Sequence, residues 1–391
     1  MTIIIISLGI FISILICIEL AYLIIPNSPL VIIPIKSEIL DSSDKKIKYS
    51  CTFKIINTSK YKEIMIPDIN ISPELINNRY RHKLDYEFQI SIIESKYKNN
   101  YWDTQIIPNL SSITIKIDLS LFNSRLINLT SINDIWLKVL WSNYGPFGRL
   151  NREDCYLITN PYENLKSNTI NIDNINSNSN YEVFTVKTHL LGVFDDPVKT
   201  IENYTKDFLK PGDIITIGES PLAIMQGQYN NYQNINYNII TRLLCRGFNP
   251  KSSLATACGM QSLINEVGSS RVIISLIIGK LFKFIGIKGV FYRLSGYQSS
   301  LIDDISGTIP PYDKTIVLGP KNINSFCKSI KENLNIDIAI VDVNDLGKVK
   351  ILSSNKECDR NIVYQALSNN PAGNSNEKTP IVIIRPKKIN K

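Results

Sequence analysis

The sequence predicts an N-terminal transmembrane helix, then a β-rich sandwich-like domain, and then a C-terminal α+β domain. Three observations predict this order. A nearly unbroken apolar segment opens the chain, short stretches of alternating apolar and polar residues follow it, and helical and strand-like patterns then alternate. The predicted boundaries are 1–26 for the anchor, 36–165 for the β-rich domain, 166–180 for a polar linker and 181–391 for the α+β domain.

The composition is that of a folded chain with more than one domain. Its 391 residues are 44% hydrophobic and 20% charged, which excludes a wholly disordered or fibrous protein. The formal net charge is +8, but the basic residues are scattered instead of gathered in one stripe, so we expect no nucleic-acid partner. Seven widely spaced cysteines without a CxxC motif predict neither a disulfide framework nor a zinc site, and favour a reducing compartment.

The first element is predicted to be an uncleaved membrane anchor. The segment from Ile3 to Ile25 is almost wholly apolar, and Glu19 is its one charged side chain; a helix of about 20 apolar residues can cross a bilayer. A signal peptide would have a basic start and a small-residue cleavage site. Because lysines follow the segment and none precedes it, we expect a single-pass membrane protein, attached through this helix, with its C-terminal domains in the cytoplasm.

The second part is predicted to be a small sandwich. Apolar and polar residues alternate from Ile47 to Ile55 and from Ile113 to Ile117, as in half-buried strands. All three tryptophans lie in this part, and we expect them to be core aromatics of the sandwich rather than a binding patch; they are Trp102, Trp136 and Trp141.

The tract 166–180 reads KSNTINIDNINSNSN, which has too few apolar residues to pack and is predicted to be a linker. After it, Asp196 followed by Pro197 predicts a helix start. Apolar runs predict strands near 214–217, 315–318, 338–343 and 381–384, and helical spacing predicts helices near 323–334 and 362–367. The apolar stretch 271–291 contains three lysines, so we expect a buried or interfacial helix there rather than a second span.

Few motifs point to chemistry. The chain has no GxxxxGK[ST], GxGxxG, HExxH or GxSxG. The paired acids Asp303 and Asp304 are either oxygen ligands for a divalent cation or turn formers. Asp342 ends a buried strand, where α/β folds often bind ligands, or it opens a hairpin. His189 is either structural or a group that moves protons or binds phosphate.

In order along the chain, four segments resemble the coenzyme F(420):L-glutamate ligase (gamma-glutamyl ligase) family. They are VKTHLLGVFDDPVKTIENYTKDFLKPGDIITIGES, LIDDISGTIPPYDKTIVLGP, IAIVDVNDLGKVKILSS and ALSNNPAGNSNEKTPIVIIR. The resemblance covers about half of the chain, roughly residues 183–391. With its apolar start and β-rich region, the whole chain is similar to membrane-anchored ligase-like proteins of cyanobacteria.

This resemblance implies a ligase that uses GTP and Mg²⁺ or Mn²⁺ to form a gamma-glutamyl amide bond between a small-molecule acid and an amino acid. It implies metal binding by Asp304, with Ser306 beside it, and by Asp342, with Asp345 as the alternative in register. It places Thr188, His189, Leu190 and Leu191 on a nucleotide-contacting segment. Related ligases also suggest a homodimer. No catalytic residue follows from it.

The same comparison leaves a second function open. Ala223, Ile224 and Gln226 stand where the family has a serine, a lysine and an acidic residue, and the loss of a lysine removes a phosphate-facing cation. The alternative is therefore a non-catalytic, membrane-anchored binding or scaffold protein with a degenerate ligase domain. A third hypothesis is an extracytoplasmic protein whose β-rich domain binds envelope components, although the unpatterned cysteines speak against it.

Overall fold

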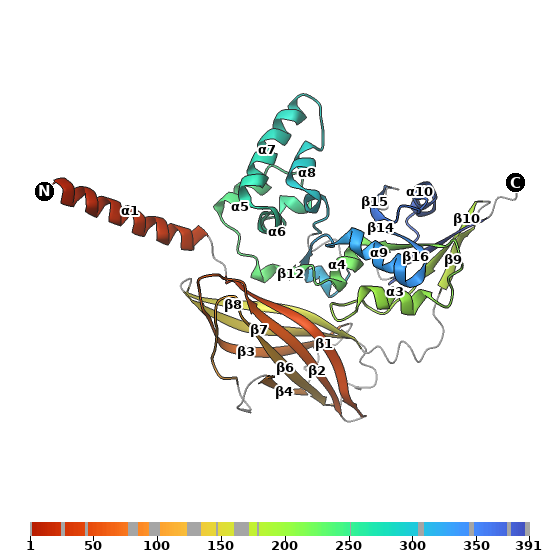
Figure 1. The fold of residues 1–391 in the computed structure, drawn as a ribbon, viewed down its shortest axis with the longest axis horizontal. Helices are drawn as coiled ribbons and strands as arrows, with labels where there is room; N and C mark the ends of the chain where they lie inside the picture. The colour runs from red at the N-terminus through yellow and green to blue at the C-terminus, as the bar shows by residue number, and fades with distance from the viewer. Residues whose placement is uncertain are drawn as a thin grey trace.

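The structure is a computed structural model of the chain. It describes residues 2–24, 28–43, 46–76, 85–93, 102–122, 134–145, 148–159, 172–177, 180–250, 252–303, 309–343, 348–373 and 377–387. A helix extends from the N-terminal end, a β-sandwich follows it, and a sheet with helices lies beside the sandwich, with a separate group of helices above (Figure 1).

The helices and strands alternate in type only in the C-terminal half. The α-helices are α1 (Thr2–Ile24), α3 (Pro197–Thr205), α4 (Glu219–Met225), α5 (Ile239–Cys245), α6 (Ala257–Val267), α7 (Ser269–Phe284), α8 (Val290–Ser295), α9 (Ile323–Leu334) and α10 (Arg360–Leu367). The first eight strands are β1 (Leu30–Ser42), β2 (Lys46–Asn57), β3 (Ile64–Leu75), β4 (Asp85–Ile92), β5 (Gln105–Ile107), β6 (Ser112–Phe122), β7 (Asp134–Gly145) and β8 (Gly148–Thr159). The others are β9 (Ile172–Ser177), β10 (Tyr181–Val186), β11 (Ile214–Gly218), β12 (Tyr229–Asn231), β13 (Thr315–Val317), β14 (Asp337–Val343), β15 (Val349–Ser354) and β16 (Ile381–Pro386).

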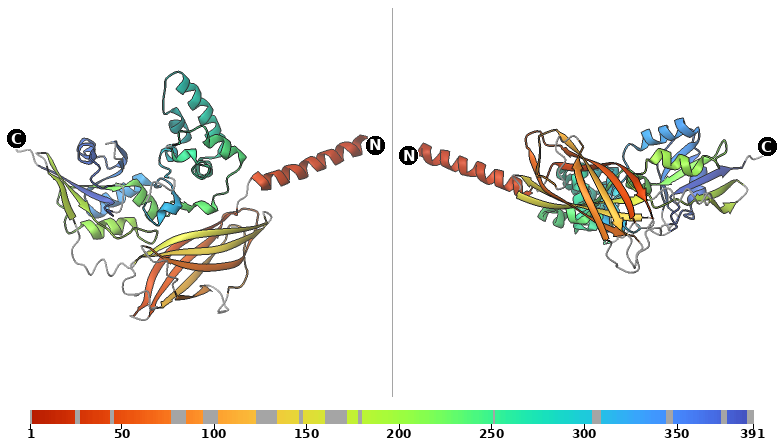
Figure 2. Two further views of the ribbon diagram at one scale, coloured as in Figure 1. Left: turned by 180° about the vertical axis from the view of Figure 1, so that it is seen from behind. Right: turned by 90° about the horizontal axis from the view of Figure 1, so that it is seen from below.

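The first helix corrects the prediction of a membrane anchor. The apolar segment does form a helix, α1, which projects away from the rest of the chain in the views of Figures 1 and 2. A crossing needs about 20 consecutive apolar residues in one helix. Among the residues that the structure describes, no helix meets the requirement of length and apolar character for a membrane span. The transmembrane helix predicted over 1–26 is therefore wrong, and so is the single-pass membrane location with cytoplasmic C-terminal domains that rested on it.

The β-rich region is a sandwich of two antiparallel sheets. One sheet has the order β1-β2-β6-β4 and the other β5-β3-β7-β8. Successive side chains of a strand point to opposite faces, so every second residue of these strands points between the two sheets. These side chains form one continuous apolar core that includes Phe53, Ile117 and Trp141. Trp136 differs from the prediction: its neighbours Ile135 and Leu137 face this core, so its own side chain lies on the outer surface of the sheet.

The C-terminal sheet is mixed and is covered by helices on both faces. Its order is β15-β14-β11-β16-β10-β9, and β11 and β14 form a parallel pair in it. Apolar residues of α3, α4 and α9 pack on one face, and those of α10 pack on the other. Asp196 caps α3 by accepting hydrogen bonds from the N–H groups of Val198 and Lys199, as predicted. The tract predicted as a linker contributes an edge strand, β9, which pairs with β10.

The segment between β12 and β13 forms a separate helical lobe of α5, α6, α7 and α8. Its apolar core includes Met260, Leu263, Val272 and Phe291. In both views of Figure 2 the lobe lies nearer to the N-terminal helix than the mixed sheet does, and the mixed sheet lies nearer to the C-terminus.

The sandwich and the C-terminal sheet share a small apolar core. Trp136 and Leu157 of the sandwich pack with Leu190, Ile224 and Tyr312. The Trp136 and Tyr312 rings meet edge to face, with centroids 5.3 Å apart, an arrangement that stabilises aromatic pairs. The sandwich therefore packs directly against the C-terminal domain through buried apolar side chains.

Candidate functional site

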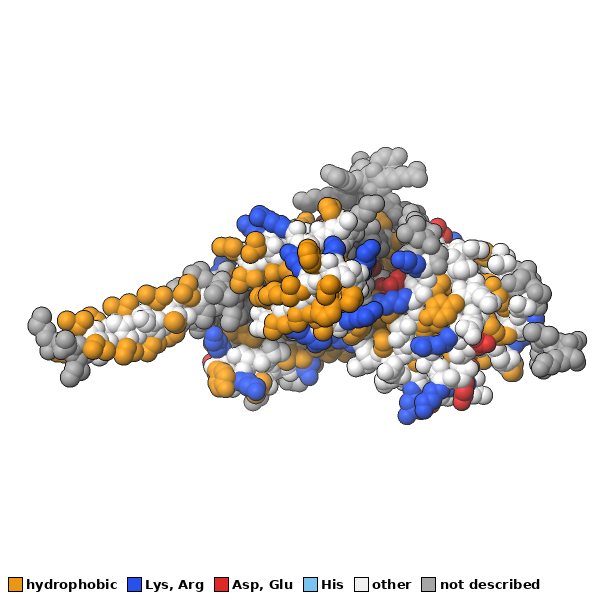
Figure 3. Space-filling view, turned by 90° about the horizontal axis from the view of Figure 1, so that it is seen from above, with side chains coloured by type: hydrophobic (Ala, Val, Ile, Leu, Met, Phe, Trp, Pro, Cys, Tyr) orange, Lys and Arg blue, Asp and Glu red, His pale blue; other side chains and the backbone are white. Residues whose placement is uncertain are grey.

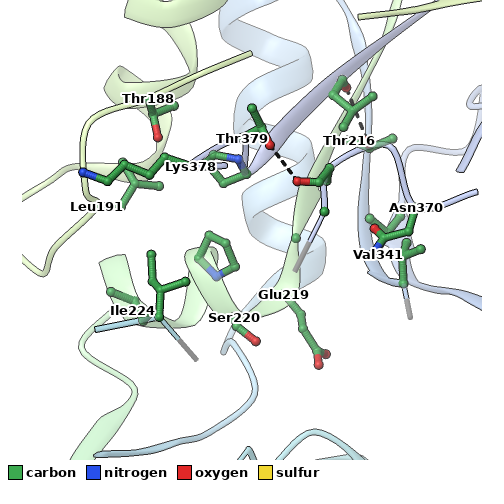
Figure 4. Close-up of a pocket in the computed structure, with 18 of the residues that line it drawn as sticks. Thr188, Leu191, Thr216, Glu219, Ser220, Ile224, Val341, Asn370, Lys378 and Thr379 are labelled. Carbon is green, nitrogen blue, oxygen red and sulfur yellow. Dashed lines mark hydrogen bonds between the residues drawn. The ribbon is translucent and has the colours of Figure 1, made fainter. Parts of the chain in front are cut away.

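A cavity of about 500 Å³ lies at one edge of the mixed sheet. Its lining comes from the turn after β10, the start of α4, the ends of β11 and β14, and the segment between α10 and β16. Figure 4 shows these groups around one space, with Thr188 and Leu191 on one side and Glu219 and Ser220 below. A cavity of this size accommodates a small organic ligand.

Two acidic residues reach the cavity because their strands run in parallel. β11 and β14 are neighbours, and Gly218 pairs with Val341 in their register. The residues that follow these two positions, Glu219 and Asp342, therefore lie at the same edge of the sheet. Ligands of α/β folds bind outside the carboxyl ends of parallel strands, and both side chains line the cavity.

A third carboxylate, Asp303, comes from the segment that leaves the helical lobe. Its backbone N–H and C=O both pair with Val317, at 2.9 and 3.0 Å. Its Oδ2 accepts a hydrogen bond of 3.0 Å from the Ser220 hydroxyl at the start of α4. Two hydrogen-bonded contacts thus hold this carboxylate beside the other acids.

The three acids repel one another in a mostly buried space. Burial raises the pKa of Glu219 to about 9, and the charges of Asp342 and Asp303 add to the effect, while Lys350 opposes it. Burial also raises the pKa of Asp303 to about 6, against the hydrogen bond from Ser220, and burial raises the pKa of Asp342. Glu219 Oε2 is buried and has no hydrogen-bond partner among the described residues. Such a cluster favours bound protons or a cation.

The segment predicted to contact a nucleotide forms one wall of the cavity. Thr188, His189, Leu190 and Leu191 all line it. The Thr188 N–H donates to the carbonyl of Lys378, at 2.8 Å. This hydrogen bond ties the turn after β10 to the segment before β16.

His189 is held in place by two neighbours. Its Nδ1 lies 2.6 Å from the Tyr204 hydroxyl, which also accepts from the His189 backbone N–H. Its Nε2 lies 3.1 Å from Asp195 Oδ1, and Asp195 in turn accepts from the Gly192 N–H. The contact of Nδ1 with Tyr204 fixes the ring, while the buried Nε2 faces Asp195 without a hydrogen bond among the described residues. This arrangement suits a residue that positions the turn.

Lys378 supplies a positive charge at the cavity wall. In Figure 4 its side chain extends along the turn that holds Thr188 and Leu191. Its Nζ lies 4.0 Å from Asp134 of the sandwich, a distance at the limit of an ion pair. Beside it, the Thr379 hydroxyl donates to the Ala372 carbonyl at 2.6 Å and steadies the loop after α10.

The predicted metal ligands are only partly described. Asp342 lies in the cavity, whereas Asp304, Ser306 and Asp345 lie outside the described residues. Within the described ranges, no group of three or more His, Cys, Asp or Glu side chains is arranged so that it could hold a metal ion. The assignment of Asp304, Asp342 and Asp345 to a metal site stays a prediction.

The sequence prediction did not single out Glu219 or Lys378 as site residues, and it left open whether Asp303 binds a cation or forms a turn. For Glu219 a signal existed, because it lies two residues after the predicted strand 214–217, much as Asp342 lies near the end of the predicted strand 338–343. Treating both strand ends alike would have found it. Asp303 is one of the paired acids that the sequence offers as cation ligands or turn formers, and it lines the cavity. Lys378 follows no strand, and we find no local pattern that marks it.

Comparison with known proteins supports a ligase-like family. Residues 33–162 match the family described as F420-0:gamma-glutamyl ligase, N-terminal Ig-like domain. The matched residues cover most of the sandwich and end before the domain that contains the cavity. The Ig-like description agrees with the sandwich of two antiparallel sheets. No curated protein matches the chain significantly.

Similarity to solved structures is low. The X-ray structure of Northeast Structural Genomics Consortium target SoR45 is 12% identical, with coverage of 35% of this chain and 90% of that one and a TM-score of 0.22. A protein from Archaeoglobus fulgidus is 14% identical, with coverage of 33% and 95% and a TM-score of 0.17. The yeast GGA1 GAE domain is 14% identical, with coverage of 32% and 99% and a TM-score of 0.16. At these TM-scores the similarity supports no inference about the fold or function of this chain.

Proposed function

We propose that the chain is a ligase that forms an amide bond between a small acid and an amino acid, with a nucleotide and a divalent cation bound in the cavity beside β11 and β14. The observation that carries the proposal is the convergence of Glu219, Asp303 and Asp342 on one cavity. The match of the sandwich to the Ig-like domain of a gamma-glutamyl ligase supports glutamate as the amino acid. GTP as the nucleotide is what the resemblance of the C-terminal segments implies.

The acids fit a hard divalent cation by their chemistry. Mg²⁺ prefers oxygen ligands and is commonly held by one or two carboxylates together with substrate phosphates and waters. Asp303 and Asp342 would supply these carboxylates, and a group of three preformed ligands is not required. The cation would neutralise charge on the phosphates during phosphoryl transfer.

The raised pKa values imply that protons and the cation compete. At neutral pH the Glu219 carboxyl holds a proton, because its pKa is raised to about 9. Asp303, with a pKa near 6, also holds a proton on its carboxylate when the pH is acidic. A bound cation favours the charged forms, so its binding should release protons and strengthen as the pH rises. Glu219 is also placed to exchange a proton inside the cavity, as a general acid or base requires.

Thermal unfolding of the full chain tests the proposal. Addition of GTP with Mn²⁺ or Mg²⁺ should raise the unfolding midpoint, because a ligand at about 100 times its dissociation constant stabilises the folded state by about 2.7 kcal/mol. Asp342→Asn should abolish this metal-dependent shift. Asp337→Asn is the matched control: it lies at the opposite end of β14 and pairs with Lys331, so its shift should persist. No shift with GTP or ATP and either cation in the unaltered chain would contradict the proposal.

The alternative function, a binding or scaffold protein with a degenerate ligase domain, rests on the apolar residues at positions 223 and 224. The two functions differ in turnover. A ligase should release nucleoside diphosphate and phosphate only when an acid and an amino acid are both present. Ligand-induced stabilisation without such release under any substrate pair would favour the binding protein. The homodimer and the absence of a nucleic-acid partner stay predictions.

A further inference from the structure

The helical lobe ends in an exposed tip that is both apolar and basic. Every residue from 280 to 289 is exposed. The large apolar side chains of this tip are Leu281, Phe282, Phe284, Ile285 and Ile287, and its lysines are Lys280, Lys283 and Lys288. Phe284 is 95% exposed. Contiguous exposed apolar groups of this kind mark interaction sites.

An apolar stripe continues the tip along α7. Ile274, Ile277, Leu281 and Phe284 recur at spacings of three and four residues, which places them on one face of the helix. All four side chains are more than half exposed. The stripe is about 15 Å long, at a rise of 1.5 Å per residue.

The lobe does not need this stripe for its own core. Val272 and Ser275 on the other face of α7 are buried, and Gly279 lies so close to α8 that an added Cβ would be 2.9 Å from the Cβ of Phe291. This close approach already packs α7 against α8. The exposed stripe and tip are therefore a second apolar surface, and no described residue covers them.

The charge of the segment that forms α7 and α8 indicates which kind of partner can cover this surface. Residues 269–295 contain Arg271, Lys280, Lys283, Lys288 and Arg293 and no Asp or Glu. The nearest acid in the lobe sequence, Glu266, pairs with Lys321 at 3.3 Å. Seen from above, the lobe shows orange apolar groups with blue basic groups around them (Figure 3). A second copy of the same face would bring like charges together, whereas a negatively charged surface would complement them.

We propose that the tip and stripe of α7 dock on an anionic lipid surface, with the apolar side chains in the headgroup region and the lysines at the lipid phosphates. Helices with an apolar face and Lys or Arg beside it lie in the plane of such interfaces without crossing them. Lysine stems also lie along apolar surface while their ammonium groups reach the charged layer. The cavity at β11 and β14 is not part of this surface.

A fluorescent probe at the tip tests the docking in the full chain. Phe284→Trp introduces an indole at the most exposed position of the tip, and Tyr61→Trp is the matched control, since Tyr61 is 91% exposed on the sandwich. With phosphatidylcholine vesicles that contain phosphatidylglycerol, the emission of the Phe284→Trp variant should shift to the blue and be quenched by brominated acyl chains. The control variant should show neither change beyond that of the unaltered chain.

Charge provides the second arm of the test. Substitution of the three tip lysines by glutamine in the Phe284→Trp background should weaken vesicle binding by about 100-fold, from about fivefold per lysine near an anionic surface. Added salt should weaken binding in the same direction. The proposal fails if the chain binds vesicles while the probe remains unquenched, since another segment then makes the contact. It also fails if the probe shifts with protein concentration alone, since a second copy then covers the tip.

Discussion

Replacement of Glu219 by glutamine should stabilise the protein, and increasingly so as the pH rises. The side chain is 9% exposed, and burial together with the nearby Asp342 and Asp303 raises its pKa from 4.5 to about 9. The folded state therefore binds a proton that the unfolded state releases above about pH 4.5. Between these two pKa values, each pH unit removes about 1.36 kcal/mol from the free energy of unfolding.

Glutamine keeps the shape of the protonated acid and does not titrate. The free energy of unfolding of Glu219→Gln, minus that of the unaltered chain, should thus increase by about 4 kcal/mol between about pH 5 and pH 8. It should level off above about pH 9, where the carboxyl is ionised in both states. Urea unfolding at a series of pH values measures both free energies, and taking the difference cancels the titration of groups that the substitution leaves unchanged.

Glu332→Gln is the control, because this glutamate lies on the surface of α9 in an exposed i,i+4 pair with Lys328. Its difference from the unaltered chain should stay within about 1 kcal/mol and change little with pH. A flat difference for Glu219→Gln over the same range would refute the reasoning that a buried, proton-bound carboxyl lies in the cavity.

Three further substitutions test individual contacts of the fold. Asp213→Ala should lower the free energy of unfolding by about 3–5 kcal/mol in urea titrations, because it leaves Arg385 without the buried carboxylate that accepts its two hydrogen bonds of 2.8 and 2.9 Å. Trp136→Ala should cost about 3–5 kcal/mol and also weaken ligand-induced shifts in calorimetry, since the ring packs against the cavity wall. Gly259→Ala should lower the thermal midpoint, because the new Cβ would meet the Ser253 carbonyl oxygen at 2.2 Å.

Much of the C-terminal domain could be predicted from the sequence, because its strands are short apolar runs between clear helix signals. The predicted helix 323–334 has the bounds of α9, and the predicted strand 338–343 lies within β14. These elements carry their own periodicity and caps. Strand pairing, in contrast, depends on contacts between distant segments, so the parallel pair of β11 and β14 that gathers the acids had no local signal.

The predictions that failed were those that inferred the location of a segment or side chain from its residue type alone. An apolar segment at the N-terminus favoured a membrane span, yet no helix among the described residues satisfies the length and apolar character of one. The sequence predicts that Trp136 lies in the sandwich core, because large aromatic side chains are usually buried. It is buried, but on the outer face of β7, where a second domain covers it. Local patterns predict that a side chain is buried and not which neighbour buries it.

The shared core also bears on the choice between ligase and scaffold. Ala223 and Ile224 stand where the ligase family has polar residues, which was the argument for a degenerate site. In this chain both are buried against Trp136, Leu157 and Tyr312. A lysine at position 224 would place a charge against this aromatic core, which is unfavourable without a partner. Packing of the sandwich on α4 therefore accounts for the apolar residues. The acids that would bind a cation line the same cavity at the strand ends. Ala223 and Ile224 are therefore weaker evidence against catalysis than the sequence alone suggests. Nucleotide turnover in the presence of both an acid and an amino acid is the measurement that separates the two functions.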